Sequence, residues 1–174
     1  ESKKRFERKH YFKKRIPSVV INNKRVLAVI PARYGSRRLK RKNLLKINNK
    51  SLIELTYYAA KKSKFIDRIV VSTENAIIKK SCEKINKNIV IKRPKNLSDH
   101  DTKSEKVLID VINRIGKNYF YIILLQPTSP LRTTNDINKA LMKIDKYKFD
   151  NIVSICPTSN EKSYDISISK NLLE

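Results

Sequence analysis

The sequence predicts an α/β fold, with a mostly parallel sheet covered by helices on both faces. Short apolar runs alternate with longer segments of helical period between residues 26 and 155. This alternation and its spacing are those of β-α-β units, whose strands run parallel to one another. The runs at 26–30 and 119–125 are almost purely apolar, which is typical of strands buried on both faces. We expect the run at 119–125 to be the central strand of the sheet.

Local signals mark the individual elements. Ser51 and Glu54 form a capping box, which predicts a helix from that point to about Ser63. Gly116 predicts the end of a later helix that follows a polar loop at 93–103. The expected strands are 26–30, 68–72, 89–91, 119–125 and 151–155, and the expected helices are 51–63, 76–86, 104–115 and 135–146.

Length and composition favour a single globular domain. The chain has 174 residues, 40% hydrophobic and 32% charged, which is enough to bury a core. No apolar run approaches the roughly 18 residues that a membrane helix needs, so we expect a cytoplasmic protein without a membrane partner. Cys82 and Cys156 lack the spacing of a metal site and are expected to be free thiols. We place a basic tail or linker at 1–25 and the functional domain at 26–174.

The net charge of +24 allows two interpretations. A strongly basic chain can be a nucleic-acid-binding module, which would cluster its cations on one face. The tail at 1–25 contains ten basic and two acidic residues, while most of the other Lys residues are spread over predicted helix surfaces. Dispersed Lys is typical of a solvated surface, so nucleic acid is the less favoured partner, although the positive field would attract any anionic ligand.

The segment after the first expected strand is the most informative part of the chain. Pro31 ends the apolar run, and six of the ten residues from 33 to 42 are Arg or Lys, around one of only two glycines, Gly35. A cationic loop at the carboxyl end of a parallel strand can hold a polyphosphate. Arg33 and Arg37 offer planar forks for phosphate oxygens, and Lys42 offers a point charge. The loop is neither a Walker A loop nor a G-x-G-x-x-G fingerprint.

Two further loops also follow expected strands. Gln126, Thr128 and Ser129 lie in a turn stiffened by prolines, where the Gln126 amide could orient a hydroxyl-rich ligand. The loop that begins at Arg93 contains His100 between two aspartates, a less specific pattern. Because ligands of open parallel sheets bind at the carboxyl ends of the strands, we expect these loops to meet in one crevice.

Together these motifs resemble those of the N-acylneuraminate cytidylyltransferases, the CMP-sialic acid synthetases and their pseudaminic and legionaminic acid relatives. The resemblance covers about residues 26–160. The motifs that carry it are Ala28-Val29-Ile30-Pro31-Ala32-Arg33-x-Gly35-Ser36-Arg37-Arg38-x-x-x-Lys42-Asn43-Leu44, Val71-Ser72-Thr73-Glu74, Arg93-Pro94-x-x-Leu97-Ser98-Asp99 and Leu124-Leu125-Gln126-Pro127-Thr128-Ser129-Pro130-Leu131-Arg132.

The resemblance implies a Rossmann-like, GT-A-like nucleotidyltransferase that joins CTP to the anomeric hydroxyl of a nonulosonic acid and releases pyrophosphate. It also implies Mg²⁺ and a homodimer. Arg33, Arg37 and Lys42 are the expected catalytic cations. The implied nucleotide-binding residues are Arg33, Ser36, Arg37, Lys42, Asn43, Arg93 and Ser104, and the implied sugar-binding residues are Gln126, Thr128 and Ser129.

The chain also departs from this family pattern. Arg37 stands where the family usually has Lys, Lys40 replaces a common Pro, and Glu74 and His100 replace usual aspartates. The carboxylates that hold the metal in the family lie further along, and we expect them to be missing here, since Asp165 is the only Asp after residue 155. The metal ligands of this chain are therefore unknown, and we expect it to be weakly active or inactive by itself.

One rival lies close and one lies in another class. A cytidylyltransferase for the eight-carbon keto-deoxy sugar would normally carry a Gly-Asp-Glu-Pro type of turn where Gln126 begins its own turn. A basic nucleic-acid-binding module would bind RNA or DNA in a strongly salt-sensitive way. The aromatic residues of the tail, Phe6, Tyr11 and Phe12, lie among basic residues in a pattern that suits base stacking.

Overall fold

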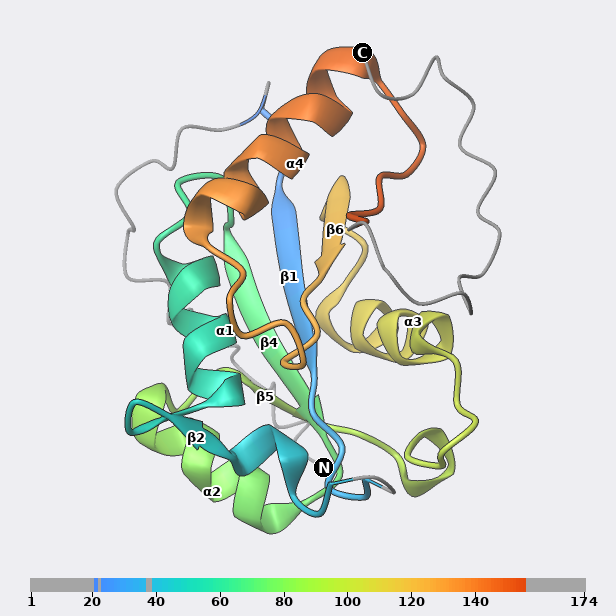
Figure 1. Ribbon diagram of the computed structural model, residues 1–174. Coiled ribbons are helices and arrows are strands. Elements are labelled where there is room, and N and C mark those ends of the chain that lie inside the picture. The colour runs from blue at the N-terminus through green and yellow to red at the C-terminus, as the bar shows by residue number, and fades with distance from the viewer. Residues whose placement is uncertain (1–20, 22, 37–38, 156–174) are drawn as a thin grey trace, which may run out of the picture.

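A four-stranded parallel sheet forms the centre of the molecule (Figure 1). The computed structural model describes residues 21, 23–36 and 39–155. The strand order is β5-β4-β1-β6, so the chain moves outward from β1 in one direction and then returns to the other side of β1. The strands are β1 (Val26–Pro31), β4 (Arg68–Thr73), β5 (Val90–Lys92) and β6 (Tyr121–Leu124).

Helices cover both faces of this sheet, as the sequence predicts. Figure 1 shows α1 and α4 side by side across one face, and α2 packs on the same face against β4 and β5. On the opposite face, Val111 of α3 packs against Leu27, Val29 and Val70. The helices are α1 (Leu52–Lys61), α2 (Ala76–Ile85), α3 (Ser104–Ile115) and α4 (Thr134–Tyr147).

The helix boundaries arise from the local signals found in the sequence. The Ser51 hydroxyl accepts a hydrogen bond from the Glu54 backbone N–H at 3.2 Å, and Glu54 Oε2 accepts one from the Ser51 N–H at 2.7 Å. This reciprocal pair confirms the capping box at the start of α1. Gly116 ends α3 with a φ of 92°, a backbone conformation that glycine adopts without steric cost.

Several short elements lie between the main strands and helices. A 3-10 turn, η1 (Lys42–Leu44), lies between β1 and α1, and a second one, η2 (Lys95–Leu97), follows β5. β2 (Lys46–Ile47) and β3 (Lys50–Ser51) form a small antiparallel ribbon. Its turn residues, Asn48 and Asn49, have φ values of 48° and 63°, a conformation that Asn tolerates well.

The structure corrects two expectations about strands. Residues 151–155 form no strand, and Ile152, Val153 and Ile155 are exposed, because this segment neither joins a hydrogen-bonded ladder nor meets a surface that would bury its apolar side chains. Without it, β6 is an edge strand of the described sheet and not its centre. Accordingly Ile122 of β6 is partly exposed, whereas the five residues of β1 from Val26 to Ile30 are fully buried.

The folded unit also extends before residue 26. Ile21 is buried in the main core cluster, and the Lys24 ammonium lies 3.3 Å from Asp145 Oδ1, although both residues fall within the segment that the sequence assigns to the tail. Residues 1–20 and 22 of that segment lie outside the described residues, as does Cys156. None of the described helices is long and apolar enough to cross a membrane.

Cys82 supports a first prediction. It is free and fully buried in α2, and burial raises the pKa of its thiol to about 12. Because the thiolate is the reactive form, Cys82 is expected to resist alkylation by iodoacetamide at pH 8 in the native protein and to react fully in urea. A Cys156→Ser variant isolates the signal, and mass spectrometry of the product measures it. Rapid native labelling would contradict the burial of this thiol.

Candidate functional site

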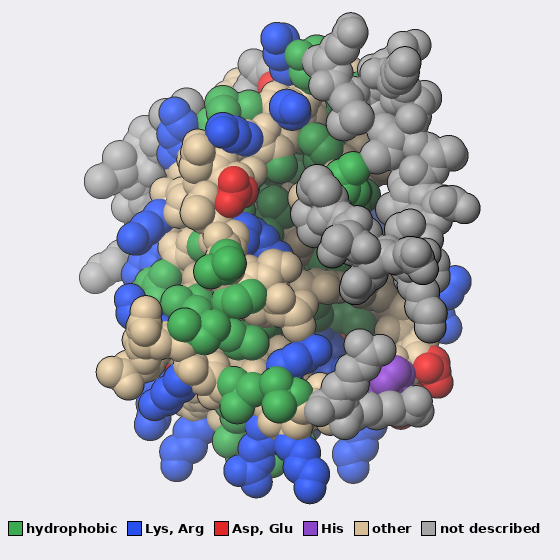
Figure 2. All heavy atoms as spheres, viewed as in Figure 1, with side chains coloured by type: hydrophobic (Ala, Val, Ile, Leu, Met, Phe, Trp, Pro, Cys, Tyr) green, Lys and Arg blue, Asp and Glu red, His purple; other side chains and the backbone are tan. Residues whose placement is uncertain are grey.

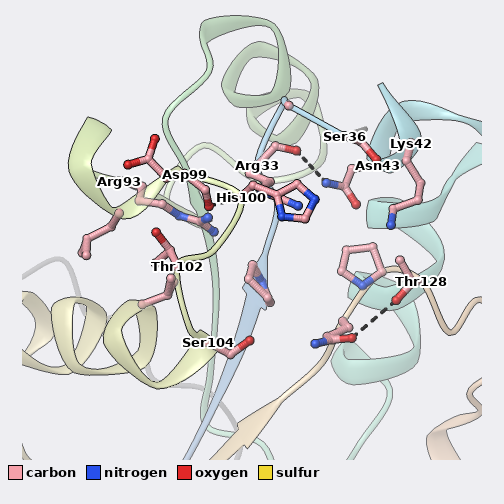
Figure 3. A pocket seen from close by; sticks show the side chains of 16 residues that line it. Arg33, Ser36, Lys42, Asn43, Arg93, Asp99, His100, Thr102, Ser104 and Thr128 are labelled. Atoms are coloured by element: carbon pink, nitrogen blue, oxygen red, sulfur yellow. Dashed lines mark hydrogen bonds between the residues drawn. The ribbon is translucent and has the colours of Figure 1, made fainter. Parts of the chain in front are cut away.

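A cavity of about 230 Å³ opens at the carboxyl ends of the central strands. Its walls come from the loops after β1, β5 and β6 and from the first turns of α3, so segments nearly 100 residues apart meet there (Figure 3). This edge, between β1 and β6, is where the chain reverses its direction across the sheet. Open parallel sheets bind ligands at such a switch point.

The cavity unites most of the site residues expected from the sequence. Figure 3 shows Arg93 and Ser104 on one side of it and Lys42 and Thr128 on the other. The expected residues that line it are Arg33, Ser36, Lys42, Asn43, Arg93, Ser104, Gln126 and Thr128. Ser129 is not among the lining residues, and its backbone N–H donates to the Gln126 carbonyl at 3.4 Å. Arg37 lies outside the described residues.

The cationic loop is held in place by contacts at both of its ends. Asn43 is 7% exposed, and its side-chain amide donates to the Arg33 carbonyl at 2.8 Å. Arg33 Nη1 in turn donates to the Asp99 carbonyl at 3.2 Å, which links this loop to the one after β5. Asn43, expected from the resemblance as a nucleotide ligand, therefore also fixes the backbone that carries Arg33.

Arg93 is a buried cation. Its residue is 4% exposed, its Nε donates to Ser72 Oγ at 3.1 Å, and its Nη2 donates to the Ser72 carbonyl at 2.7 Å. Burial lowers the pKa of Arg93, while the negative charges of Glu74 and Asp110 oppose that effect. Arginine stays protonated in proteins, so a fixed positive charge borders the cavity at this point.

The turn after β6 is stabilised by its own side chains. Arg132 Nη2 donates to the Gln126 carbonyl at 3.1 Å, and the Thr128 hydroxyl lies 3.5 Å from Gln126 Oε1. These contacts hold the backbone of Gln126, which lines the cavity.

The start of α3 adds backbone N–H donors near the cavity. Ser104 lines the cavity, and the side chain of the N-cap residue, Lys103, makes no capping hydrogen bond with the first turn of the helix.

The loop after β5 brings further residues to the cavity beyond those expected to bind a ligand. Asp99 and His100 line the cavity, although the sequence pattern of the loop after β5 is only a weak indication of a functional site. The His100 ring points towards the centre of the site in Figure 3, and its Nδ1 lies 3.3 Å from Asp101 Oδ1. Thr102 and Val107 complete this wall. No periodicity marks such residues, because their proximity depends on how the loop folds over the end of the sheet.

The described residues contain no group of three or more His, Cys, Asp or Glu side chains that could hold a metal ion. Asp99 is the one described carboxylate residue that lines the cavity. The Mg²⁺ implied by the resemblance therefore has no matching set of ligands in the described part of the chain.

Figure 2 bears on the competing nucleic-acid interpretation. On the face that it shows, Lys and Arg side chains are spread around the surface, between patches of hydrophobic and uncharged residues. The described residues visible on this face form no single continuous basic stripe of the kind that follows a nucleic-acid backbone.

Comparison with known proteins gives the family. A sequence profile described as cytidylyltransferase matches residues 27–165. The chain is 35% identical to a CMP-N,N'-diacetyllegionaminic acid synthase of Legionella pneumophila over 83% of its own length and 63% of that protein's. It is 32% identical to an N-acylneuraminate cytidylyltransferase of Streptococcus agalactiae, over 82% and 35% of the two lengths.

Solved structures agree with these relatives. A CMP:2-keto-3-deoxy-manno-octonic acid synthetase, determined as a complex with CTP, superposes with a TM-score of 0.61 at 27% identity. The match covers 70% of this chain and 48% of that one, so the chain spans between about a third and two thirds of the length of these relatives. The matched profile, the relatives and the shared fold establish that this chain belongs to the cytidylyltransferase family.

Proposed function

We propose that this chain binds CTP in the cavity between β1, β5 and β6 and serves a cytidylyltransferase that activates a nonulosonic acid. The observation that carries the proposal is the meeting of Arg33, Lys42 and Arg93 with the Gln126 amide around one cavity. Three cations from two separate loops suit a triphosphate, because charge-assisted hydrogen bonds to phosphate oxygens are strong. The start of α3 adds backbone N–H groups, which favour anions.

In the proposed reaction, the anomeric hydroxyl oxygen of the sugar acid attacks the α-phosphorus of CTP. A new P–O bond forms, the bond between the α-phosphorus and the bridging oxygen to the β-phosphate breaks, and pyrophosphate leaves while the hydroxyl proton passes to solvent. Arg33 and Lys42 would neutralise charge on the phosphates, and Gln126 would orient the sugar through its amide. Such a transfer depends mainly on positioning and charge stabilisation.

The choice of a nonulosonic acid is supported by the relatives and by the turn after β6. The first relatives are named for legionaminic and neuraminic acid products, whereas a 3-deoxy-manno-octulosonate cytidylyltransferase of Leptospira interrogans matches 62% of this chain at 35% identity. The eight-carbon sugar is therefore the second candidate. The proposal also includes Mg²⁺ as the metal, a homodimer and a cytoplasmic location, because the family resemblance implies them.

Isothermal titration with nucleotides tests the proposal without requiring turnover. We expect the wild-type chain to bind CTP more tightly than ATP or GTP, because the cavity walls must select the base while the cations hold the phosphates. Lys42→Ala is expected to weaken CTP binding about tenfold, through loss of one charge-assisted contact. Lys80→Ala, at an exposed position of α2, is the matched control and should bind as the wild type does.

Two outcomes would contradict this proposal. Equal affinity for CTP, ATP and GTP would identify a general anion site and not a cytidine nucleotide site. Tight RNA binding that falls steeply with salt, together with weak CTP binding, would favour the nucleic-acid-binding alternative.

A further inference from the structure

Glu74, directly after β4, contacts the backbone of the cationic loop. Its Oε1 accepts a hydrogen bond from the Tyr34 N–H at 2.6 Å. Tyr34 lies between Arg33 and Gly35, at the point where the chain leaves β1 and enters the loop. A carboxylate that accepts a backbone N–H makes a short and strong hydrogen bond. Glu74 therefore holds the loop at its base, although it is not among the residues that line the cavity.

The second oxygen of Glu74 is buried. Oε2 has no hydrogen-bond partner within the part of the chain that the structure describes. A buried carboxylate oxygen without such a partner is unfavourable unless nearby positive charge offsets its desolvation. The negative charge of Glu74 opposes the lowering of the Arg93 pKa by burial more than that of Asp110 does, so the Arg93 guanidinium lies within electrostatic range of this carboxylate.

The end of β4 thus connects two parts of the site. The Ser72 carbonyl accepts hydrogen bonds from the Ala32 N–H at 2.9 Å and from Arg93 Nη2 at 2.7 Å. Arg33 repels Arg93 electrostatically. A negative charge beside both the loop and Arg93 lowers the free energy of holding these cations together before an anionic ligand arrives.

We propose that Glu74 is a positioning residue for nucleotide binding, which anchors the loop through Tyr34 and provides the counter-charge for Arg93. This inference rests on the proposed function, because it concerns the affinity of the same cavity for CTP. A positioning role for Glu74 means that removal of its side chain weakens CTP binding. An acid that only adds negative potential near the site would repel a triphosphate, so its removal would tighten binding.

Three variants test this inference. Glu74→Gln keeps an oxygen acceptor for the Tyr34 N–H and removes the charge, Glu74→Ala removes both, and Glu74→Asp keeps the charge on a shorter side chain. Titration with CTP is expected to give about tenfold weaker binding for Glu74→Ala, a smaller loss for Glu74→Gln, and the affinity closest to wild type for Glu74→Asp. Glu83→Gln, which removes a surface charge that pairs with Lys79 on α2, is the control and should change CTP affinity little.

Parallel titration with CMP separates positioning from general destabilisation. If Glu74 positions the loop that faces the phosphates, the ratio of CTP to CMP affinity falls in Glu74→Gln, whereas partial unfolding would weaken both ligands equally. Equal or tighter CTP binding by Glu74→Gln and Glu74→Ala, with normal binding by the wild type, would overturn this inference alone. Failure of the wild type to bind CTP would overturn the proposed function and this inference with it.

Discussion

Arg33→Ala is expected to weaken CTP binding by about 10- to 100-fold. The guanidinium of Arg33 lines the cavity and also donates to the Asp99 carbonyl at 3.2 Å. Its removal therefore takes away a phosphate-binding cation and the link between the loops after β1 and β5. Hydrogen bonds to charged groups contribute about 1.5–3 kcal/mol, and each 1.4 kcal/mol changes affinity about tenfold, which sets the expected range.

Isothermal titration measures this effect, and Arg33→Lys refines its meaning. Lysine restores the charge but not the planar fork, so an intermediate affinity would show that the geometry of the guanidinium contributes. The melting temperature provides a check that each variant remains folded. An Arg33→Ala chain that binds CTP within twofold of wild type would exclude Arg33 from the nucleotide site.

Ile78→Ala is expected to lower the free energy of unfolding by about 2–5 kcal/mol. Ile78 is 1% exposed and belongs to the main core cluster on the face of the sheet covered by α1, α2 and α4. Its truncation removes buried apolar surface and leaves a cavity that the surrounding core fills only in part. Since small domains are stable by roughly 5–15 kcal/mol, the loss would be a large part of the total.

The adjacent residue of the same helix provides a matched control. Ile77 is 52% exposed, and its backbone N–H, like that of Ile78, is capped by the Asn75 side chain. Ile77→Ala makes the same chemical change at a solvated position and should alter stability by no more than about 0.5 kcal/mol. Urea denaturation compares the two variants. Equal losses would mean that α2 does not pack on the sheet as described.

Much of the candidate site could be predicted because its signals are local. Pro31 ends an apolar strand immediately before the cationic loop, and Gln126 follows the last strand in the same way. Parallel strands have their carboxyl ends at one edge of the sheet, and these two loops lie near each other because β1 and β6 are neighbouring strands. The cavity that both line confirms this proximity, and the use of these residues in binding CTP stays a proposal.

Other features depend on contacts between residues that are distant in sequence. In the sequence, Glu74 follows a strand as an ordinary surface acid would, and it stands where the family usually has Asp. Its contact with Tyr34, 40 residues earlier, exists because β4 lies beside β1 in the sheet.

The sequence by itself therefore determined the family, the alternation of β1, β4, β5 and β6 with the four helices, the helix caps at Ser51 and Gly116, and the cationic loop. These features are encoded by residues within a few positions of one another, where backbone preference and side-chain capping act directly. Only the tertiary structure decided the strand order, the edge position of β6, the exposure of 151–155 and the partner of Glu74. Their physical cause is the hydrogen bonding and burial between distant segments, which no local pattern specifies.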